Sequence, residues 1–230
     1  MEIQSITGVT EKMGILVTQP CHLLMVSASV PIVLEKIELS MVDFTTGKTT
    51  PIVRNEKMDL LNDIIGHVNH MNPTTLFIEI GDDANFNFSA QRVLKIDLSV
   101  LTAGTVYTIH AVDANNSKDA LTIYNQLTVP QGVSVQKFPI ESGEALIFPE
   151  VNFKEIKLKW SNGIEQIRTA AEMVQLRYLT TVVAPALAFV QDLNDEKLGI
   201  HVFQVEFTLT AATGYVFYIM ESGRPGISQY

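Results

Sequence analysis

The histidines of the chain are the first side chains that could do chemistry, because imidazole is a common metal ligand. His67 and His70 are three residues apart on a segment with helical spacing, so both could face one ion. No cysteine or carboxylate at a matching spacing completes a site, and the second half of the chain has no counterpart. We therefore interpret the pair as a solvated helix end, and we predict no metal site and no cofactor.

Two acidic loops, residues 81–85 and 192–196, offer oxygen ligands of the kind that Ca²⁺ prefers. Neither loop has the spacing of an EF-hand. A calcium site at a subunit contact stays open as an alternative, but we interpret both loops as solvated turns.

Nucleophilic catalysis is not indicated either, because the chain has no Gly-x-Ser-x-Gly turn. The single cysteine, Cys21, has His22 beside it, but neighbouring residues of a strand point to opposite faces and would not form a catalytic pair. The glycine-rich residues 221–226 form a tail and not the strand-to-helix turn of a phosphate loop. We expect a buried, structural Cys21, no catalytic residues, and a protein that is not an enzyme.

The composition indicates well-packed cores and a partner other than nucleic acid. Of the 230 residues, 47% are hydrophobic and 18% are charged, and the formal net charge is −9. A protein that grips phosphate backbones needs a basic face, so we expect no direct nucleic-acid binding. The lone cysteine and an N-terminus without signal-peptide character predict synthesis in a reducing cytoplasm without secretion.

The strands and turns that would position any site occur twice along the chain. Residues 34–40 match residues 153–159, with Ile37 in the place of Ile156, and in both copies apolar and charged residues alternate as in a half-buried strand. A glycine-containing turn and a second short strand follow each copy, at 50–53 and at 164–167.

The end of each half repeats as well. Residues 93–99 match residues 202–208, with Ile96 in the place of Val205. A turn of small residues follows in both, and residues 105–109 then correspond to residues 215–219. Four matching features in the same order favour duplication over chance similarity of two β-rich domains.

Between these strands each half changes to helical spacing, with Asn55 as an expected N-cap in the first half. The residues on one helical face are Leu61, Ile64, Ile65 and Val68 in the first half, and Ile167, Ala171, Val174 and Tyr178 in the second. The sequence thus predicts an all-β protein of two tandem jelly-roll β-sandwiches, each with one short inserted helix. We expect the first at 1–128, with an N-terminal segment, and the second at 129–230, with a C-terminal tail.

This arrangement resembles the double jelly-roll major capsid proteins of tailless, internal-membrane-containing icosahedral bacteriophages of the corticovirus-like type. The strand–turn–strand–helix blocks at 34–68 and 153–178 and the hairpins at 93–109 and 202–219 carry the resemblance. It implies a structural coat protein that forms homotrimers with a hexagonal outline, which tile an icosahedral virion shell beside neighbouring capsomers. It also implies penton or other minor capsid proteins and an internal lipid membrane as partners.

Two other functions are alternatives. A carbohydrate- or surface-binding module can be built from two β-sandwiches, but such modules display exposed aromatics, and the only tryptophan here is Trp160 at a strand end. A minor virion protein, such as a spike or penton, is the second alternative. The tail from Glu221 to Tyr230 is a further hypothesis: Ile227 and Tyr230 could anchor it on a neighbouring subunit as an assembly arm.

Overall fold

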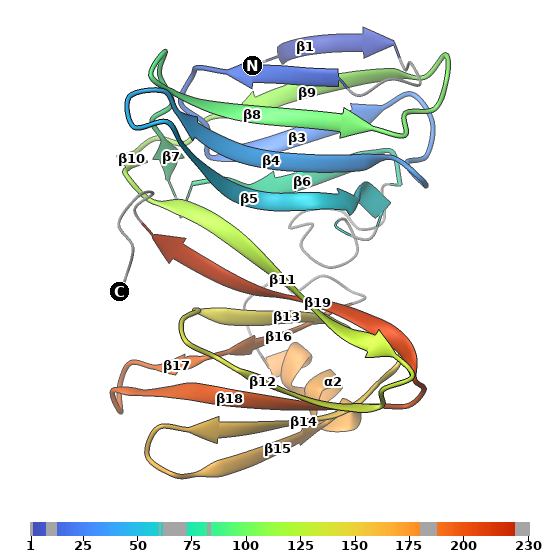
Figure 1. The fold of residues 1–230 in the computed structure, drawn as a ribbon, viewed down its shortest axis with the longest axis vertical. Coiled ribbons are helices and arrows are strands. Elements are labelled where there is room, and N and C mark those ends of the chain that lie inside the picture. Colours follow the sequence, from blue (N-terminus) through green and yellow to red (C-terminus); the bar gives the residue numbers. More distant parts are fainter. Residues whose placement is uncertain are drawn as a thin grey trace. The chain divides into compact units, whose positions relative to one another are not determined.

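The computed structural model describes residues 2–7, 13–59, 61, 73–81, 84–179 and 188–223. The chain forms two compact units, Met1–Tyr124 with Ser222–Tyr230, and Asn125–Glu221, which we call unit 1 and unit 2. Figure 1 shows that almost all described elements are strands, and the chain passes from unit 1 to unit 2 within a single long strand.

Unit 1 contains two four-stranded antiparallel sheets (Figure 1). The first has the order β1 (Glu2–Thr7), β9 (Val106–Val112), β3 (Leu23–Ala28) and β6 (Thr75–Glu79). The second has the order β2 (Met13–Val17), β8 (Arg92–Ser99), β4 (Lys36–Asp43) and β5 (Lys48–Lys57). The short strands β7 (Asn85–Phe86) and β10 (Ser117–Lys118) form a separate parallel pair.

Unit 2 is built from the remaining strands in the same way. One sheet has the order β11 (Leu121–Gln131), β19 (Thr213–Gly223), β13 (Ala145–Pro149) and β16 (Ala188–Asp192). The other has the order β12 (Val135–Pro139), β18 (Ile200–Leu209), β14 (Phe153–Trp160) and β15 (Glu165–Thr169), and β17 (Asn194–Asp195) also pairs with β18.

Both units therefore have the jelly-roll strand order. Adding ten to each label of β1-β9-β3-β6 and β2-β8-β4-β5 gives β11-β19-β13-β16 and β12-β18-β14-β15. In each unit the first strand of the sandwich pairs with its last, β1 with β9 and β11 with β19. Successive sandwich strands alternate between the two sheets except at the hairpins β4–β5 and β14–β15, as in a Greek-key sandwich. The predicted fold class, two tandem jelly rolls in an all-β chain, is confirmed.

The repeat seen in the sequence also preserves the register of the central strand pair. In unit 1 Ile37 of β4 lies opposite Leu98 of β8. In unit 2 Ile156 of β14 lies opposite Phe207 of β18, and these are the residues that the sequence alignment puts in the places of Ile37 and Leu98. Because a one-residue slip would turn every inward side chain outward, this agreement shows that the sequence match reflects the same pairing.

The helix expected in the second half is α2 (Ala170–Leu179). It begins after Thr169 because Thr169 and Glu172 form a reciprocal cap: the Glu172 carboxylate accepts the backbone N–H of Thr169 at 2.7 Å, and the Thr169 hydroxyl accepts that of Glu172 at 3.3 Å. Ile167, expected on the helix, therefore lies in β15 instead.

The expected N-cap of the first helix was wrong, because Asn55 lies inside β5. Met58, Asp59 and Leu61 adopt helical conformation just after that strand. The other positions on this predicted helix, Ile64, Ile65 and Val68, lie outside the described residues.

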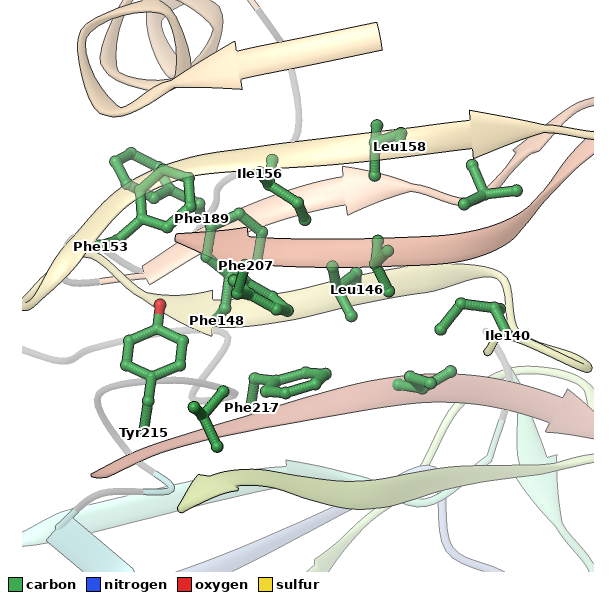
Figure 2. Packing of buried hydrophobic residues seen from close by; sticks show 14 of the residues in the cluster. Ile140, Leu146, Phe148, Phe153, Ile156, Leu158, Phe189, Phe207, Tyr215 and Phe217 are labelled. Carbon is green, nitrogen blue, oxygen red and sulfur yellow. The ribbon is translucent and has the colours of Figure 1, made fainter. Parts of the chain in front are cut away.

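The two cores differ in chemistry. Among the described residues, the buried apolar side chains in the two four-stranded sheets of unit 1 are aliphatic apart from Met41 and Tyr107, and Phe86 of the short strand β7 is buried as well. Unit 2 instead centres on Phe207, whose ring lies 4.5 Å from that of Phe217, 5.4 Å from that of Phe148 and 5.6 Å from that of Tyr215 (Figure 2). Tilted and edge-to-face pairs of this kind add to the stabilisation that burial provides.

Candidate functional site

The loops at one end of unit 1 are held together by a buried carboxylate. Glu35, immediately before β4, is 1% exposed and accepts hydrogen bonds at both oxygens. One oxygen accepts the Tyr107 and Thr102 hydroxyls, each at 2.7 Å, and the other accepts the backbone N–H groups of Val33 at 2.8 Å and Leu34 at 2.9 Å. This brace fastens the β3–β4 loop to the β8–β9 turn, which contains Thr102.

The electrostatics of Glu35 follow from these four donors. Burial alone would raise its pKa, but the hydrogen bonds from Tyr107, Thr102 and the backbone outweigh it and lower the pKa from 4.5 to about 2. The pKa of Tyr107 is raised, first by burial and then by its bond to Glu35. Glu35 is thus a permanently ionised, fully used acceptor near neutral pH, and its role is structural.

Unit 2 has a brace at the corresponding place, built from an amide. Asn152, immediately before β14, accepts the backbone N–H of Ala211 at 2.6 Å and the hydroxyl of Thr210 at 2.8 Å, and donates to the backbone oxygen of Ala211 at 2.9 Å. Its φ of 68° lies in the left-handed region, which asparagine tolerates better than most residues. The same two loops are therefore joined in both units, by different side chains.

Exposed aliphatic side chains surround the brace of unit 1. The β3–β4 loop and the start of β9 are joined by backbone hydrogen bonding, since the N–H of Ser29 donates to the Val106 oxygen at 2.9 Å. We call the exposed aliphatic residues of this end the apolar tip: Val30, Val33, Leu34, Val100 and Val106. Leu34 is 60% exposed and Val100 is 51% exposed.

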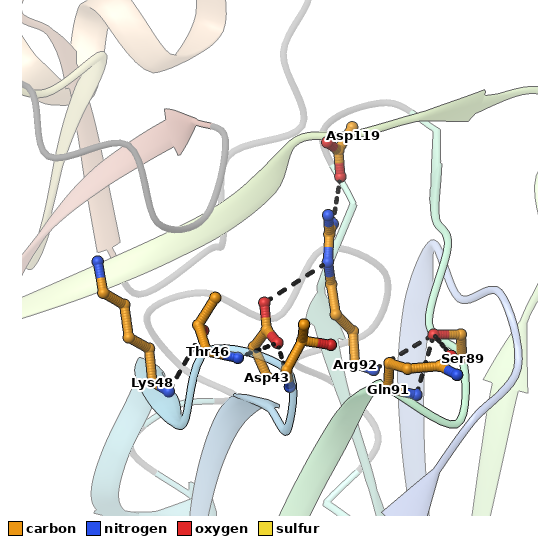
Figure 3. A network of polar contacts seen from close by, with 8 residues as sticks. Asp43, Thr46, Lys48, Ser89, Gln91, Arg92 and Asp119 are labelled. Atoms are coloured by element: carbon orange, nitrogen blue, oxygen red, sulfur yellow. Dashed lines mark hydrogen bonds and ion pairs between the residues drawn. The ribbon is translucent and has the colours of Figure 1, made fainter.

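At the other end of unit 1, an arginine links three segments (Figure 3). The Arg92 guanidinium at the start of β8 lies 2.8 Å from the Asp119 carboxylate before β11 and 3.9 Å from that of Asp43 at the end of β4. Asp43 also accepts the backbone N–H groups of Thr45 and Thr46 in the β4–β5 turn, and these bonds lower its pKa. The network fixes turns and offers no reactive group.

The outer face of the β12-β18-β14-β15 sheet carries alternating charges. Lys137, Glu206 and Lys157 lie on three neighbouring strands in register, and the Lys137 ammonium is 3.2 Å from the Glu206 carboxylate. Glu165 on β15 contacts Lys157 at 2.6 Å and Lys159 at 3.1 Å. The charged side chains named here are therefore used in ion pairs along this face.

Of the residues singled out for chemistry, those that the structure describes do not form a reactive site. Cys21 is buried, as predicted, and burial raises its pKa to about 12, so it is a poor nucleophile near neutral pH. His22 contacts the backbone oxygen of Gly81 at 3.1 Å through Nδ1. His67 and His70, and Asp82 and Asp83 of the first acidic loop, lie outside the described residues.

The polar side chains of the second acidic loop are used in hydrogen bonds to the backbone. Asp195 accepts the backbone N–H of Leu198 at 3.1 Å, and the Asn194 side chain donates to the Gly143 oxygen at 2.8 Å. Across the described part of the chain, no three histidine, cysteine, aspartate or glutamate side chains are grouped as metal ligands. Within those same residues no helix is long and apolar enough to cross a membrane.

The strand order and the two braces define a tandem jelly-roll protein, and comparison with solved structures gives the same result. The chain is similar to the major capsid protein P2 of bacteriophage PM2, with a TM-score of 0.63 over 100% of this chain and 98% of that one, at 10% sequence identity. The exported protein XepA of PBSX matches with a TM-score of 0.26 at 9% identity over 97% of this chain and 86% of that one, which is too low to indicate a shared fold.

Comparisons of the sequence itself give no such likeness. No protein-family model matches the chain, and no curated protein matches it. The likeness to the capsid protein is therefore one of fold.

Proposed function

We propose that the protein is a structural coat protein that self-assembles into the shell of an icosahedral virion. The observation that carries this proposal is the duplicated jelly roll: two sandwiches with the same strand order, and the same register in the central strand pair, within one chain. Two equivalent barrels per subunit turn a threefold trimer into a six-cornered outline, which can tile a facet without gaps. The capsid protein with the same fold spans the full length of this chain.

A structural rather than catalytic role follows in the same proposal. The polar groups described above form the hydrogen bonds of the braces and turns, and Cys21 is buried with a raised pKa. The functional partners would be further copies of the chain, minor capsid proteins at the vertices, and a lipid membrane beneath the shell. The protein would be made in the host cytoplasm and reside in the virion.

The test is the mass and form of the purified protein. Light scattering across a range of concentrations should give a species of three times the 25.5 kDa subunit mass or larger, and electron microscopy should show six-cornered particles or sheets built from them. A strictly monomeric protein at high micromolar concentration would contradict the proposal and favour a binding module, which glycan-array binding by that monomer would then identify.

A further inference from the structure

Strand β2 forms an open edge of the β2-β8-β4-β5 sheet. Within the described residues its only hydrogen-bonded neighbour is β8, along a register without irregularities. On the outer face of β2, Leu16 is 55% exposed and Gly14 is exposed as well. An edge strand presents a second row of backbone N–H and C=O groups on the side away from its neighbour, and in β2 this row is available to a further strand.

The edge of β2 lacks the features that keep edge strands from pairing, which are charged residues, prolines and irregular registers. Every other edge strand of the two sandwiches has a charged residue or a proline within its bounds. For example, β5 contains Pro51 and Arg54, and its register against β4 is irregular. The sequence of β2 is Met-Gly-Ile-Leu-Val, with none of these features. Its edge is therefore unprotected.

The equivalent edge strand of unit 2, β12, is protected at the matching positions. Because β8 and β18 correspond residue by residue, the residues opposite them correspond as well. The pairs are Gly14 opposite Asp97 and Lys137 opposite Glu206, then Leu16 opposite Lys95 and Pro139 opposite Gln204. Gly14 and Leu16 of unit 1 thus occupy the places of a lysine and a proline in unit 2, and these are two residues that block an edge. Unit 2 closes the edge that unit 1 leaves open.

The sequence of β2 is also complementary to itself. In an antiparallel pair of two β2 strands centred on Ile15, Gly14 of each copy lies opposite Leu16 of the other. Glycine has no side chain, so the exposed leucine of one copy can lie over the backbone of the other. No charged group of β2 is buried by such pairing. The contact is two-fold and closed, so it joins two copies and no more.

From these features we infer that β2 is an assembly edge: it pairs antiparallel with β2 of a second copy and joins two β2-β8-β4-β5 sheets into one. Main-chain hydrogen bonds supply the affinity, and the match of Gly14 with Leu16 sets the register. The inference goes beyond the coat function and does not depend on it. In a shell, the contact would join two neighbouring trimers across a two-fold axis.

The first test is sedimentation of the intact protein over a range of concentrations. It should show a step that doubles the mass, from one copy to two or from trimers to pairs of trimers. Leu16→Lys should raise the concentration at the midpoint of this step roughly a hundredfold, because each contact loses two half-exposed leucines. Val135→Lys is the matched control, since Val135 is 50% exposed on β12, the equivalent strand of unit 2. The control should associate like the unchanged protein, and both variants should keep its circular dichroism spectrum.

The second test is disulfide crosslinking, which reports on the register. Opposite residues of an antiparallel pair have Cα atoms about 4.5–5.5 Å apart, a distance that a disulfide can span. A mixture of the Gly14→Cys and Leu16→Cys proteins should therefore crosslink on mild oxidation, whereas each variant alone should crosslink much less. The natural Cys21 does not interfere, because it is buried.

Several results would overturn the inference. These are no doubling of mass at high micromolar concentration, equal association of Leu16→Lys and Val135→Lys, or crosslinking of Leu16→Cys alone as strong as that of the mixture. The outcomes also separate this inference from the coat function. Six-cornered particles that form equally well in Leu16→Lys, without crosslinking of the cysteine mixture, would remove the β2 contact and leave the coat function. A protein that forms only crosslinkable pairs of single copies would do the reverse.

Discussion

Units 1 and 2 reach the same strand order with different interiors and different braces. Unit 1 fills its sandwich with branched aliphatic side chains and joins its loops through the buried carboxylate of Glu35. Unit 2 packs aromatic rings around Phe207 and joins the same loops through the amide of Asn152. The difference shows that a jelly roll depends on which positions point inward and which loops are joined, and that the side chains at those positions can be exchanged for others.

The largest effect should come from the centre of the aromatic core. Phe207→Ala removes a ring that touches several others, and it should lower the stability of unit 2 by about 3–5 kcal/mol. Urea unfolding followed by the fluorescence of Trp160, the only tryptophan, reports on unit 2 because Trp160 packs against this core. The matched change in unit 1 is Leu98→Ala, at the equivalent register position; it should leave the Trp160 transition in place, and a shift as large as that of Phe207→Ala would show that the units do not unfold separately.

The two braces should differ in strength. Glu35→Gln places an amide N–H₂ against donors and leaves buried hydroxyl and N–H groups unpaired, so we expect a loss of about 2–3 kcal/mol in unit 1. Asn152→Ala, in the less buried brace, should cost about 1–2 kcal/mol in unit 2. Circular dichroism measures the loss of stability in Glu35→Gln, and Trp160 fluorescence measures the loss in Asn152→Ala. Equal losses would mean that burial of the Glu35 carboxylate adds nothing to the strength of its brace.

Acid should affect the two units unequally. The pKa of Glu35 is about 2 in the folded protein and 4.5 ordinarily, so its contribution is fully present above about pH 4.5 and disappears as the pH falls towards 2. The loss of unfolding free energy in unit 1 amounts to at most about 3 kcal/mol. Asn152, which takes the place of Glu35 in unit 2, does not titrate. In Glu35→Gln, this part of the pH dependence of the unfolding midpoint, which lies between pH 4.5 and about pH 2, should vanish. Identical acid profiles for Glu35→Gln and the unchanged protein would refute the assignment.

The smallest effect concerns backbone strain. Val100→Gly should raise the stability of unit 1 by no more than about 1 kcal/mol, because relief of the positive φ is partly offset by the greater freedom of glycine in the unfolded chain. Val151→Gly is the comparison in unit 2, since Val151 is exposed but has no positive φ. Differential scanning calorimetry should show a small gain for the first and a small loss for the second.

The sequence predicted the parts of this fold that depend on local pattern. Alternation along residues 34–40 and 153–159 predicts strands, and the match of Ile37 to Ile156 predicts the shared register. The prediction from Asn55 was wrong because a capping residue marks a helix start only where the preceding strand has ended, and β5 continues to Lys57. Glu35 and Asn152 were missed because each takes its meaning from a turn more than fifty residues away, and nothing in the neighbouring sequence signals that contact.

The shared register also has a consequence for folding on the ribosome. In each unit the first strand pairs with the last, so neither sandwich can close until its last strand has been synthesised, and unit 1 has all its strands well before unit 2. A mistaken pairing of β4 with β18 would satisfy the backbone as well as the native one. It would, however, set Phe207 opposite Ile37, where the native partner is Leu98, and overfill an aliphatic core. The different core side chains therefore disfavour pairing between a strand of unit 1 and a strand of unit 2.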